Sequence, residues 1–357
     1  MPLLLTNDDV EALLSMKDCI AALETAYLEL AAGRAVSPMR ADALVPAAQP
    51  EQVYTLRTMS AVAPHLGVGA VRITSSILAW PERDGVRRRV RIPATDDARY
   101  VGLVLVFSTK TGETLAILPD GVMQLLRVAA TSGIALKHLA RPDASTLGLI
   151  GCGHQAETQL AAAAIVRDLR RVQCYSPSPE RREDFAARMR ERTGCDVVAV
   201  ASADEAARDA DMIVCATNAT TPVFRPDWLR PGLHFSAIRW HEIPISVIKS
   251  ADRAFIHSHD SDPAPTRTAG LVCPDDSDRR GGPLTAGLDV DALPTLLDLL
   301  ARRSEGRRSA RDTTCFVNNH GLGYQFAVLA GIACQSARER GYGKELPSVW
   351  FTEDVPP

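Results

Sequence analysis

A glycine-rich turn lies between a short apolar segment and a helical segment, and it constrains the fold more than any other feature. The apolar run Thr146–Ile150 predicts a buried strand, and Gly151-Cys152-Gly153-His154-Gln155-Ala156 follows it directly. The first glycine allows a tight turn, the second lets backbone amides approach a pyrophosphate, and the small Ala156 lets helix and strand pack closely. His154 and Gln155 open the helix, whose N-terminus favours a phosphate group. The turn therefore predicts a dinucleotide-binding site.

Further strands and helices alternate after this turn at the spacing of βαβ units. The pattern predicts helices near residues 179–192 and 203–207, and strands near 172–175, 197–200, 211–215, 233–238 and 254–257. Such an alternation is typical of an α/β fold in which helices cover both faces of a parallel sheet. We therefore expect a doubly wound Rossmann sheet.

The segments outside this series have a different residue pattern. Helical periodicity extends to about residue 40, and apolar β-branched runs at 68–77 and 100–108 predict strands. Residues 109–113 read as a hairpin turn, and 80–97, rich in Arg, Asp and Pro, as a solvated loop. Residues 120–139 and 314–340 predict long helices, the second returning to the N-terminal half.

Composition excludes several classes of protein. The 357 residues carry 40 Lys and Arg against 43 Asp and Glu, a net charge of −3 that gives no basic excess for nucleic acid. No apolar run is long enough to cross a membrane, and the N-terminus lacks the basic start of a signal peptide. The eight cysteines show no C-x-x-C spacing, so we expect no metal site, reduced thiols and a cytoplasmic location. Residues 257–262 contain His and Asp side chains of the kind that bind metals, and we interpret this segment as a solvated loop.

The segment after the second strand of the series indicates which cofactor binds. An NAD enzyme usually ends this strand with an acidic residue that binds the ribose 2′-hydroxyl. Here the strand ends without an acid, and hydroxyl and guanidinium groups follow at Ser176, Ser178, Arg181 and Arg182. Such groups suit a 2′-phosphate. We therefore expect NADP(H) as the favoured cofactor, with NAD(H) possible.

Several motifs in fixed order give the chain a family resemblance. Thr111-Gly112-Glu113, Asp120-Gly121, the run from Leu126 to Ser132 and the glycine turn follow one another at characteristic spacing. The chain resembles the ornithine cyclodeaminase/mu-crystallin family over nearly its whole length. The resemblance implies a Rossmann domain at 121–314. It also implies a second α/β domain at 1–120, completed by 315–357, that binds substrate and forms a homodimer.

The same resemblance implies a chemistry. Members hold a nicotinamide cofactor and act on a small amino or imino acid, so we expect hydride transfer between the nicotinamide and the α-carbon of such a substrate. One alternative is a cyclodeaminase, an ammonia lyase that uses NAD catalytically. Another is a cofactor-loaded binding protein without turnover.

Site residues are carried over by position. Arg127 matches the arginine that binds the substrate carboxylate, and a cation inside an apolar helix also calls for an anion. Arg40 matches a second substrate-binding arginine. The segments Thr217-Asn218 and Ser236-Ala237-Ile238 match those beside the nicotinamide.

Two positions depart from the family pattern. Arg72 stands where members usually have an active-site lysine. It keeps the charge, so we expect it to be a third arginine that binds the substrate carboxylate, but it is a poor proton donor. No aspartate follows the fifth strand, where members keep a catalytic one. His241 and Glu242 lie nearest there, so we expect His241, or failing it Glu242, to donate the proton.

Overall fold

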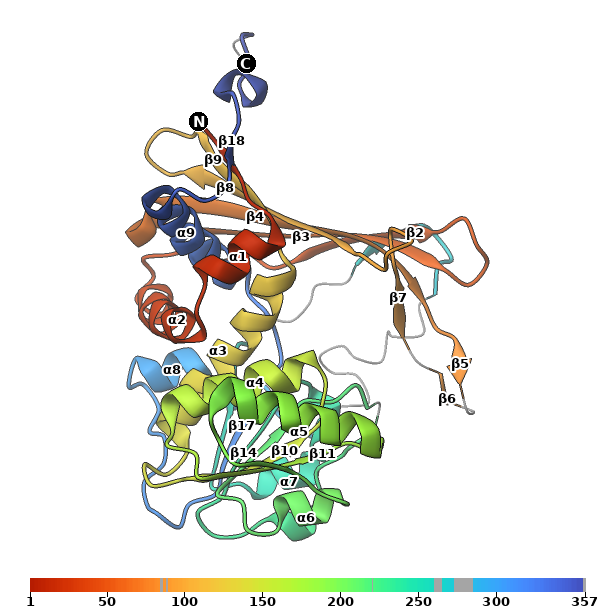
Figure 1. Cartoon of the computed structure of the whole chain (residues 1–357), viewed down its shortest axis with the longest axis vertical. Coiled ribbons are helices and arrows are strands. Elements are labelled where there is room, and N and C mark those ends of the chain that lie inside the picture. The colour runs from red at the N-terminus through yellow and green to blue at the C-terminus, as the bar shows by residue number, and fades with distance from the viewer. Residues whose placement is uncertain (84–85, 88, 220, 260–264, 273–284, 356–357) are drawn as a thin grey trace.

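The computed structural model of the chain describes residues 1–83, 86–87, 89–219, 221–259, 265–272 and 285–355. Two sheets form its framework, and Figure 1 shows them one above the other. The upper sheet is here called the N-terminal sheet, and the lower one the Rossmann sheet. The long helix α3 (Gly121–Leu139) connects them and packs against helices of both parts.

The N-terminal sheet has the strand order β16-β2-β3-β4-β8-β9-β1-β18. Its bounds are Thr266–Arg267, Ala41–Pro46, Val53–Ala63, Val68–Ala79, Val101–Ser108, Thr114–Pro119, Leu3–Leu4 and Lys344–Glu345. The strands β2, β3, β4, β8 and β9 pair antiparallel, while β1 runs parallel to β9. Chain segments from both ends therefore complete a sheet that the N-terminal half begins.

Three helices lie on one side of the N-terminal sheet, below it in Figure 1: α1 (Asn7–Leu13), α2 (Met16–Ala31) and α9 (Gly323–Arg340). Of these, α1 and α9 contact its strands, and α2 packs against α3 and α9. Each of the first two starts at a hydroxyl side chain that accepts a hydrogen bond from the third helical residue, as N-caps do. Alternate residues of β3 and β8, such as Met59 and Val104, are buried in the core between the sheet and these helices. No α-helix of the described residues covers the opposite face, which is here called the open face.

The Rossmann sheet has the order β12-β11-β10-β13-β14-β17-β15, and all its neighbouring strands are parallel. The bounds are Val197–Ala199, Arg171–Tyr175, Thr146–Ile150, Met212–Cys215, His234–Ala237, Thr314–Val317 and Arg253–Ile256. Figure 1 places α4 (His154–Val166) and α5 (Pro179–Thr193) above this sheet, and α6 (Ala203–Ala207) and α7 (Ile245–Ser250) below it. The predicted α/β fold with a doubly wound Rossmann sheet is confirmed.

Two of the predicted elements were wrong. Residues 314–340 form a strand and a helix, because Thr314–Val317 pairs with β14 and β15 before α9 begins at Gly323. The described residues of the segment 80–97 are not all loop. They include β5 (Glu82–Arg83), β6 (Val86–Arg87) and β7 (Val90–Ile92), the last paired with β4. The short helix α8 spans Leu296–Leu300.

Within the described residues, no helix is both long and apolar enough to span a bilayer. The seven described cysteines are free thiols, and the eighth lies outside the described residues. Five of these thiols are buried, and Cys152 and Cys195 are partly exposed.

Candidate active site

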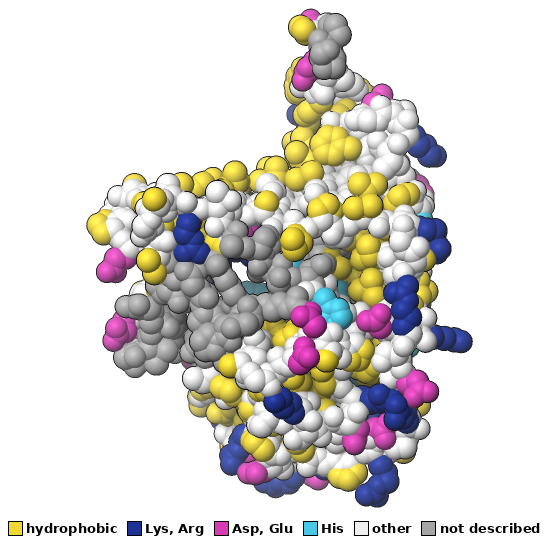
Figure 2. All heavy atoms as spheres, turned by 180° about the vertical axis from the view of Figure 1, so that it is seen from behind, with side chains coloured by type: hydrophobic (Ala, Val, Ile, Leu, Met, Phe, Trp, Pro, Cys, Tyr) yellow, Lys and Arg dark blue, Asp and Glu magenta, His cyan; other side chains and the backbone are white. Residues whose placement is uncertain are grey.

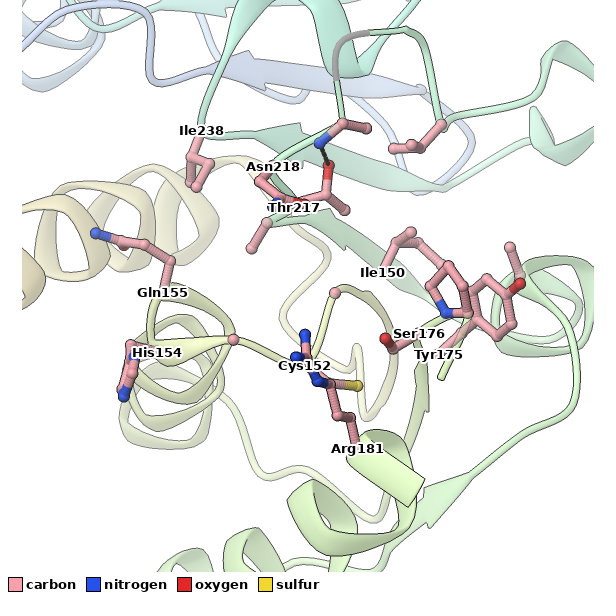
Figure 3. Close-up of a pocket in the computed structure, with 17 residues that line it drawn as sticks. Ile150, Cys152, His154, Gln155, Tyr175, Ser176, Arg181, Thr217, Asn218 and Ile238 are labelled. Atoms are coloured by element: carbon pink, nitrogen blue, oxygen red, sulfur yellow. Dashed lines mark hydrogen bonds between the residues drawn. The ribbon is translucent and has the colours of Figure 1, made fainter. Parts of the chain in front are cut away.

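A cavity of about 620 Å³ opens at the carboxyl ends of the central strands of the Rossmann sheet. In parallel sheets ligands bind at this edge, where the strand order reverses. Figure 3 shows residues from the ends of β10, β11, β13 and β14 and from the start of α4 pointing toward this space. Its lining residues are Ile150, Gly151, Cys152, Gly153, His154, Gln155, Tyr175, Ser176, Pro177, Arg181, Ala203, Ala216, Thr217, Asn218, Ala219, Val223 and Ile238.

The glycine turn has the geometry that a pyrophosphate requires. Gly151 has φ +119°, and a Cβ there would lie 2.3 Å from the carbonyl oxygen of Ala216. At Gly153 a Cβ would meet no heavy atom of the described residues within 4 Å, so this backbone faces open space. Ala156 is fully buried in the core between helix and strand. The three small residues therefore lie as the motif predicts, with Ala156 packed behind the cavity.

Most of the expected cofactor-binding residues line the cavity. They are Gly151, Gly153, His154, Gln155, Ser176, Arg181, Thr217, Asn218 and Ile238. Ser236 and Ala237, expected beside the nicotinamide, lie instead in the buried body of β14. Only the residue after that strand, Ile238, reaches the cavity.

Two residues expected to contact a 2′-phosphate have structural contacts instead. Ser178 is the N-cap of α5, where its hydroxyl accepts from the backbone N–H of Arg181 at 3.3 Å. Arg182 donates to the backbone carbonyl of Ser176 at 3.2 Å, which fixes the end of β11. Of the four candidates, Ser176 and Arg181 line the cavity.

Gln155 supplies an independent sign that a polar ligand fits here. Its Oε1 is buried and has no hydrogen-bond partner among the described residues. A buried acceptor without a partner costs free energy of roughly 1–3 kcal/mol, which a ligand donor would remove. A nicotinamide dinucleotide carries such donors on its carboxamide and ribose groups. The open backbone at Gly153 and this acceptor together fit a dinucleotide.

Glu242 ties together two loops that line the cavity. It is fully buried on η3 (Trp240–Glu242), and its Oε1 accepts from the Thr217 backbone N–H at 2.6 Å and hydroxyl at 2.8 Å. Its Oε2 accepts from the Ile238 N–H at 3.1 Å. Burial raises the pKa of the Glu242 carboxyl, and the hydrogen bonds oppose that shift. Both oxygens are thus directed at the backbone of the site.

His241, the first choice for the proton donor, lies beside Glu242 on η3 and is 7% exposed. It comes three residues after Ile238, which lines the cavity. Neither His241 nor Glu242 is among the lining residues. Their part in proton transfer stays a prediction.

Arg72 is buried against an acid. Its Nη2 and Nε lie 2.6 and 2.7 Å from Oδ2 of Asp120, the residue before α3. The guanidinium also lies 4.3 Å from the centroid of the Phe326 ring. Burial lowers the pKa of Arg72, and Asp120 acts against that shift. The charge of Arg72 is therefore largely balanced within the protein.

Arg127 lies on the same Phe326 ring, 5.3 Å from its centroid, but contacts amides in place of an acid. Its Nη1 donates to Gln325 Oε1 at 2.9 Å, and its Nε and Nη2 donate to Gln124 Oε1 at 3.3 and 3.1 Å. Burial, and then the charge of Arg72, lowers the pKa of Arg127 to about 9. Among the described residues no carboxylate pairs with Arg127.

The three substrate-binding arginines predicted from the sequence lie near one another. The charges of Arg72 and Arg40 both lower the pKa of Arg127. Arg40 itself forms a bidentate pair with Asp42, at 2.7 and 2.8 Å. Acids thus already engage Arg40 and Arg72, which distinguishes them from Arg127.

Sequence reasoning missed two residues that shape this cluster, Asp120 and Gln325. Asp120 enters the sequence analysis as a helix start and as part of a family motif, without a role in the site. Its side chain pairs with Arg72 and makes no capping hydrogen bond. A Cβ at Gly102 would lie 2.0 Å from Asp120 Oδ1, so the glycine makes room for the carboxylate. Gln325 stands in an apolar helix, the same signal that singled out Arg127.

No group of three or more potential metal ligands occurs within the described part of the chain. The expectation of a solvated loop was wrong for His257, which is fully buried and hydrogen-bonded to Tyr27. Residues 260–262 of that segment lie outside the described residues.

Comparisons with known proteins identify relatives of this chain. Residues 94–336 match the model of the ornithine cyclodeaminase/mu-crystallin family. The chain is 30% identical over 349 residues to a Delta(1)-pyrroline-2-carboxylate reductase from Bacillus cereus, covering 96% of this chain and 99% of the relative. It is 27% identical over 363 residues to an alanine dehydrogenase from Archaeoglobus fulgidus, covering 96% and 98%.

A solved structure shares the whole fold. It is the Delta(1)-pyrroline-2-carboxylate reductase of Thermococcus litoralis in complex with NADH and L-proline, with a TM-score of 0.78 and 28% identity. The match covers 96% of this chain and 100% of that one. The family resemblance predicted from the sequence motifs is confirmed. The chain therefore belongs to the ornithine cyclodeaminase/mu-crystallin family.

Proposed function

We propose that this chain reduces a carboxylate-bearing imine, an α-imino acid, with a reduced nicotinamide cofactor. The observation that carries this proposal is Arg127, a buried guanidinium that has amide partners and no acidic partner among the described residues. The same chain has a cavity that fits a dinucleotide. A buried cation of this kind is stabilised by an anion, and the carboxylate of an imino acid supplies one. The prediction of an NAD(P)-dependent enzyme of this family is itself confirmed by the reductase and dehydrogenase among its relatives.

Each part of the site has a role in this reaction. When bound, the nicotinamide supplies the hydride, and the glycine turn holds its pyrophosphate. Arg127 binds and orients the substrate carboxylate, which fixes the distance between the imine carbon and the cofactor. Arg72 and Arg40 shape the pocket with their acids Asp120 and Asp42.

The remaining roles concern the proton and the pocket walls. His241 delivers the proton to the imine nitrogen. Glu242 holds the Thr217 and Ile238 backbone in place around the nicotinamide.

Among such substrates we favour cyclic imino acids, because two of the proteins compared above are named for Delta(1)-pyrroline-2-carboxylate. The test is oxidation of NADPH and NADH by the purified chain with this compound, with its six-membered homologue, and with 2-oxo acids plus ammonia or methylamine. The matched control is 1-pyrroline, the same ring without the carboxylate. We expect turnover only with the carboxylate-bearing imines.

Arg127→Ala should lower kcat/KM for the imino acid by roughly a hundredfold or more, the cost of one lost charged contact. Turnover of 1-pyrroline at the same rate as its carboxylate would contradict the role of Arg127. Release of ammonia from an amino acid without net change of cofactor would favour the cyclodeaminase alternative.

The preference between NADP(H) and NAD(H) is part of the same proposal. Ser176 and Arg181 line the cavity beyond the end of β11, and the strand ends without an acid. A hydroxyl and a guanidinium suit the 2′-phosphate of NADPH. We therefore assign NADP(H) as the favoured cofactor, with NAD(H) possible. The free thiols suit the cytoplasm, which we propose as the location.

A homodimer is also proposed, formed through the open face of the N-terminal sheet. The register places Leu56 opposite Ser75 and Ser75 opposite Val101, so their side chains share one face. That face is the one not covered by α9, and its exposed large apolar side chains are Val45, Leu56, Val62, Val101 and Leu103. Figure 2 shows hydrophobic side chains along the upper side of the molecule, where this sheet lies. Contiguous apolar surface of this kind is typical of protein interfaces.

A further inference from the structure

A buried hydrogen-bond network surrounds the guanidinium of Arg127. Arg127 is 8% exposed and lies one helical turn before Thr131 on α3. Three of its five N–H groups donate to Gln325 and Gln124. The remaining two have no acceptor among the described residues. They are available to bind a carboxylate.

Gln325 fixes one end of this guanidinium, and its own orientation is fully determined. It is completely buried on α9. Its Oε1 accepts from Arg127 Nη1 and from the Leu322 backbone N–H, both at 2.9 Å, which only the oxygen of the amide can do. Its Nε2 donates to the hydroxyls of Tyr27 at 2.9 Å and Thr131 at 2.7 Å. Every polar atom of the amide therefore has a partner.

The hydroxyls that hold Gln325 are themselves held from other elements. Tyr27 on α2 and Thr131 on α3 are both fully buried, and their oxygens lie 2.6 Å apart. Thr131 also donates to the Arg127 backbone carbonyl at 2.8 Å. His257, which follows β15, places Nε2 3.1 Å from the Tyr27 hydroxyl. Burial lowers the pKa of His257 to about 3, so it adds no positive charge near Arg127. The network thus joins α2, α3, α9 and the Rossmann sheet.

The backbone at Gly321 also limits the movement of Arg127. A Cβ at Gly321 would lie 2.1 Å from Arg127 Nη1. The turn before α9 therefore packs directly on the guanidinium, and only a glycine permits that approach. Arg127 is held between this turn and Gln325.

We propose that Gln325 is the positioning residue of Arg127, and that it orients the two remaining N–H groups toward the substrate carboxylate. This inference rests on the function proposed above. An amide suits the task because it accepts a hydrogen bond without neutralising the guanidinium. Arg72 shows the contrast, since Asp120 takes up its charge. The two arginines over Phe326 therefore differ in what they can offer a ligand.

The test uses Gln325→Leu and Gln325→Glu in the full-length chain. Leu removes the acceptor, and Glu supplies a competing carboxylate to Arg127. Both variants should raise KM for the imino acid by roughly 10- to 100-fold, with a smaller change in kcat and unchanged affinity for NADPH. Gly321→Ala leaves Gln325 in place but displaces Arg127, because the new Cβ would lie 2.1 Å from Nη1, and it should raise KM in the same way.

A double-mutant cycle with Arg127→Lys distinguishes positioning from general support of the fold. If Gln325 acts through Arg127, the double variant Arg127→Lys/Gln325→Leu should be no worse than Arg127→Lys alone. Fully additive losses, or a Gln325→Leu variant that loses NADPH affinity along with KM, would overturn the inference.

Binding of L-proline to the NADH complex, measured by calorimetry, separates the two proposals. A chain that binds L-proline but reduces no imine would refute the proposed function. The ratio of L-proline affinities between wild type and Gln325→Leu would still decide the positioning role. If the chain neither reduces the imine nor binds L-proline, both the proposed function and the positioning role of Gln325 are refuted.

Discussion

At the scale of single residues, Gly151 and Gly153 stand in one turn but tolerate a side chain differently. Gly151→Ala places a methyl group 2.3 Å from the Ala216 carbonyl oxygen at a left-handed φ, so it should lower both the melting temperature and the cofactor affinity. Gly153→Ala meets no protein atom of the described residues, so it should leave the melting temperature unchanged and weaken cofactor binding alone. Thermal unfolding of the cofactor-free protein and fluorescence titration with NADPH measure the two effects. Equal melting losses in both variants would contradict this account.

Arg181 carries the second prediction at this scale, the choice between cofactors. Because Arg181 lines the cavity near Ser176, Arg181→Ala should weaken NADPH binding by roughly tenfold or more and leave NADH binding nearly unchanged. Arg188→Ala is the matched control. Arg188 also lies on α5, but it is paired with Asp184 at 2.9 Å and with Glu157 at 2.8 Å. An equal loss for both cofactors would place Arg181 away from the 2′-phosphate.

His241 carries the third prediction, on proton transfer. Replacement by Ala should lower kcat by roughly a hundredfold, the usual contribution of a general acid. The acid must be protonated, so wild-type kcat falls as pH rises through its titration, and the variant should lose that limb. His138→Gln serves as the control, because His138 lies at the surface and pairs with Glu24. A variant with the full wild-type pH profile would show that solvent or substrate supplies the proton.

At the scale of the element, β14 buries an unusual side chain in the middle of the Rossmann sheet. His234 begins this strand, is fully buried and hydrogen-bonds Thr314 on β17 at 2.9 Å. Its Nε2 has no partner among the described residues. Burial, and then the charge of Arg307, lowers its pKa to about 3. The strand therefore holds a neutral imidazole.

This imidazole predicts a sensitivity to acid. Between about pH 6.5 and pH 3 the unfolded chain binds a proton at His234 that the folded chain excludes. Stability should thus fall as pH falls through that window. His234→Leu should flatten the fall, since Thr314 keeps its bonds to Leu139 and Arg307. Urea unfolding at a series of pH values measures the free energy of unfolding of both proteins. If it falls equally with pH in wild type and variant, the fall does not come from His234.

At the scale of the whole molecule, the open face of the N-terminal sheet predicts self-association. Sedimentation should give a particle of twice the 38.5 kDa chain. Leu56→Lys combined with Leu103→Lys charges the centre of that face and should yield a monomer. Ile165→Lys is the control, because Ile165 is an exposed apolar residue of α4, on the other part of the molecule. A dimer that survives the double substitution would place the interface elsewhere.

The features that the sequence predicted well are local ones. The turn from Gly151 to Ala156 depends on a few consecutive residues, and a strand buried on both faces, such as Thr146–Ile150, is a continuous apolar run. The fold class and the dinucleotide site follow from such signals. The misreading of residues 314–340 shows the limit. The buried strand Thr314–Val317 and the buried helix after it are both apolar segments. Only the pairing of the strand with β14 and β15 distinguishes it from the helix.

The sequence by itself determined the dinucleotide turn, the parallel βα series and the arginines of the substrate cluster. Only the tertiary structure decided which of those arginines keeps its charge available. Arg72 meets Asp120 across 48 residues of sequence, and Arg127 meets Gln325 across 198. Such contacts leave no periodic signal in the chain, because they depend on how strand β4, helix α3 and helix α9 pack together. An acid therefore neutralises one buried guanidinium and an amide orients the other.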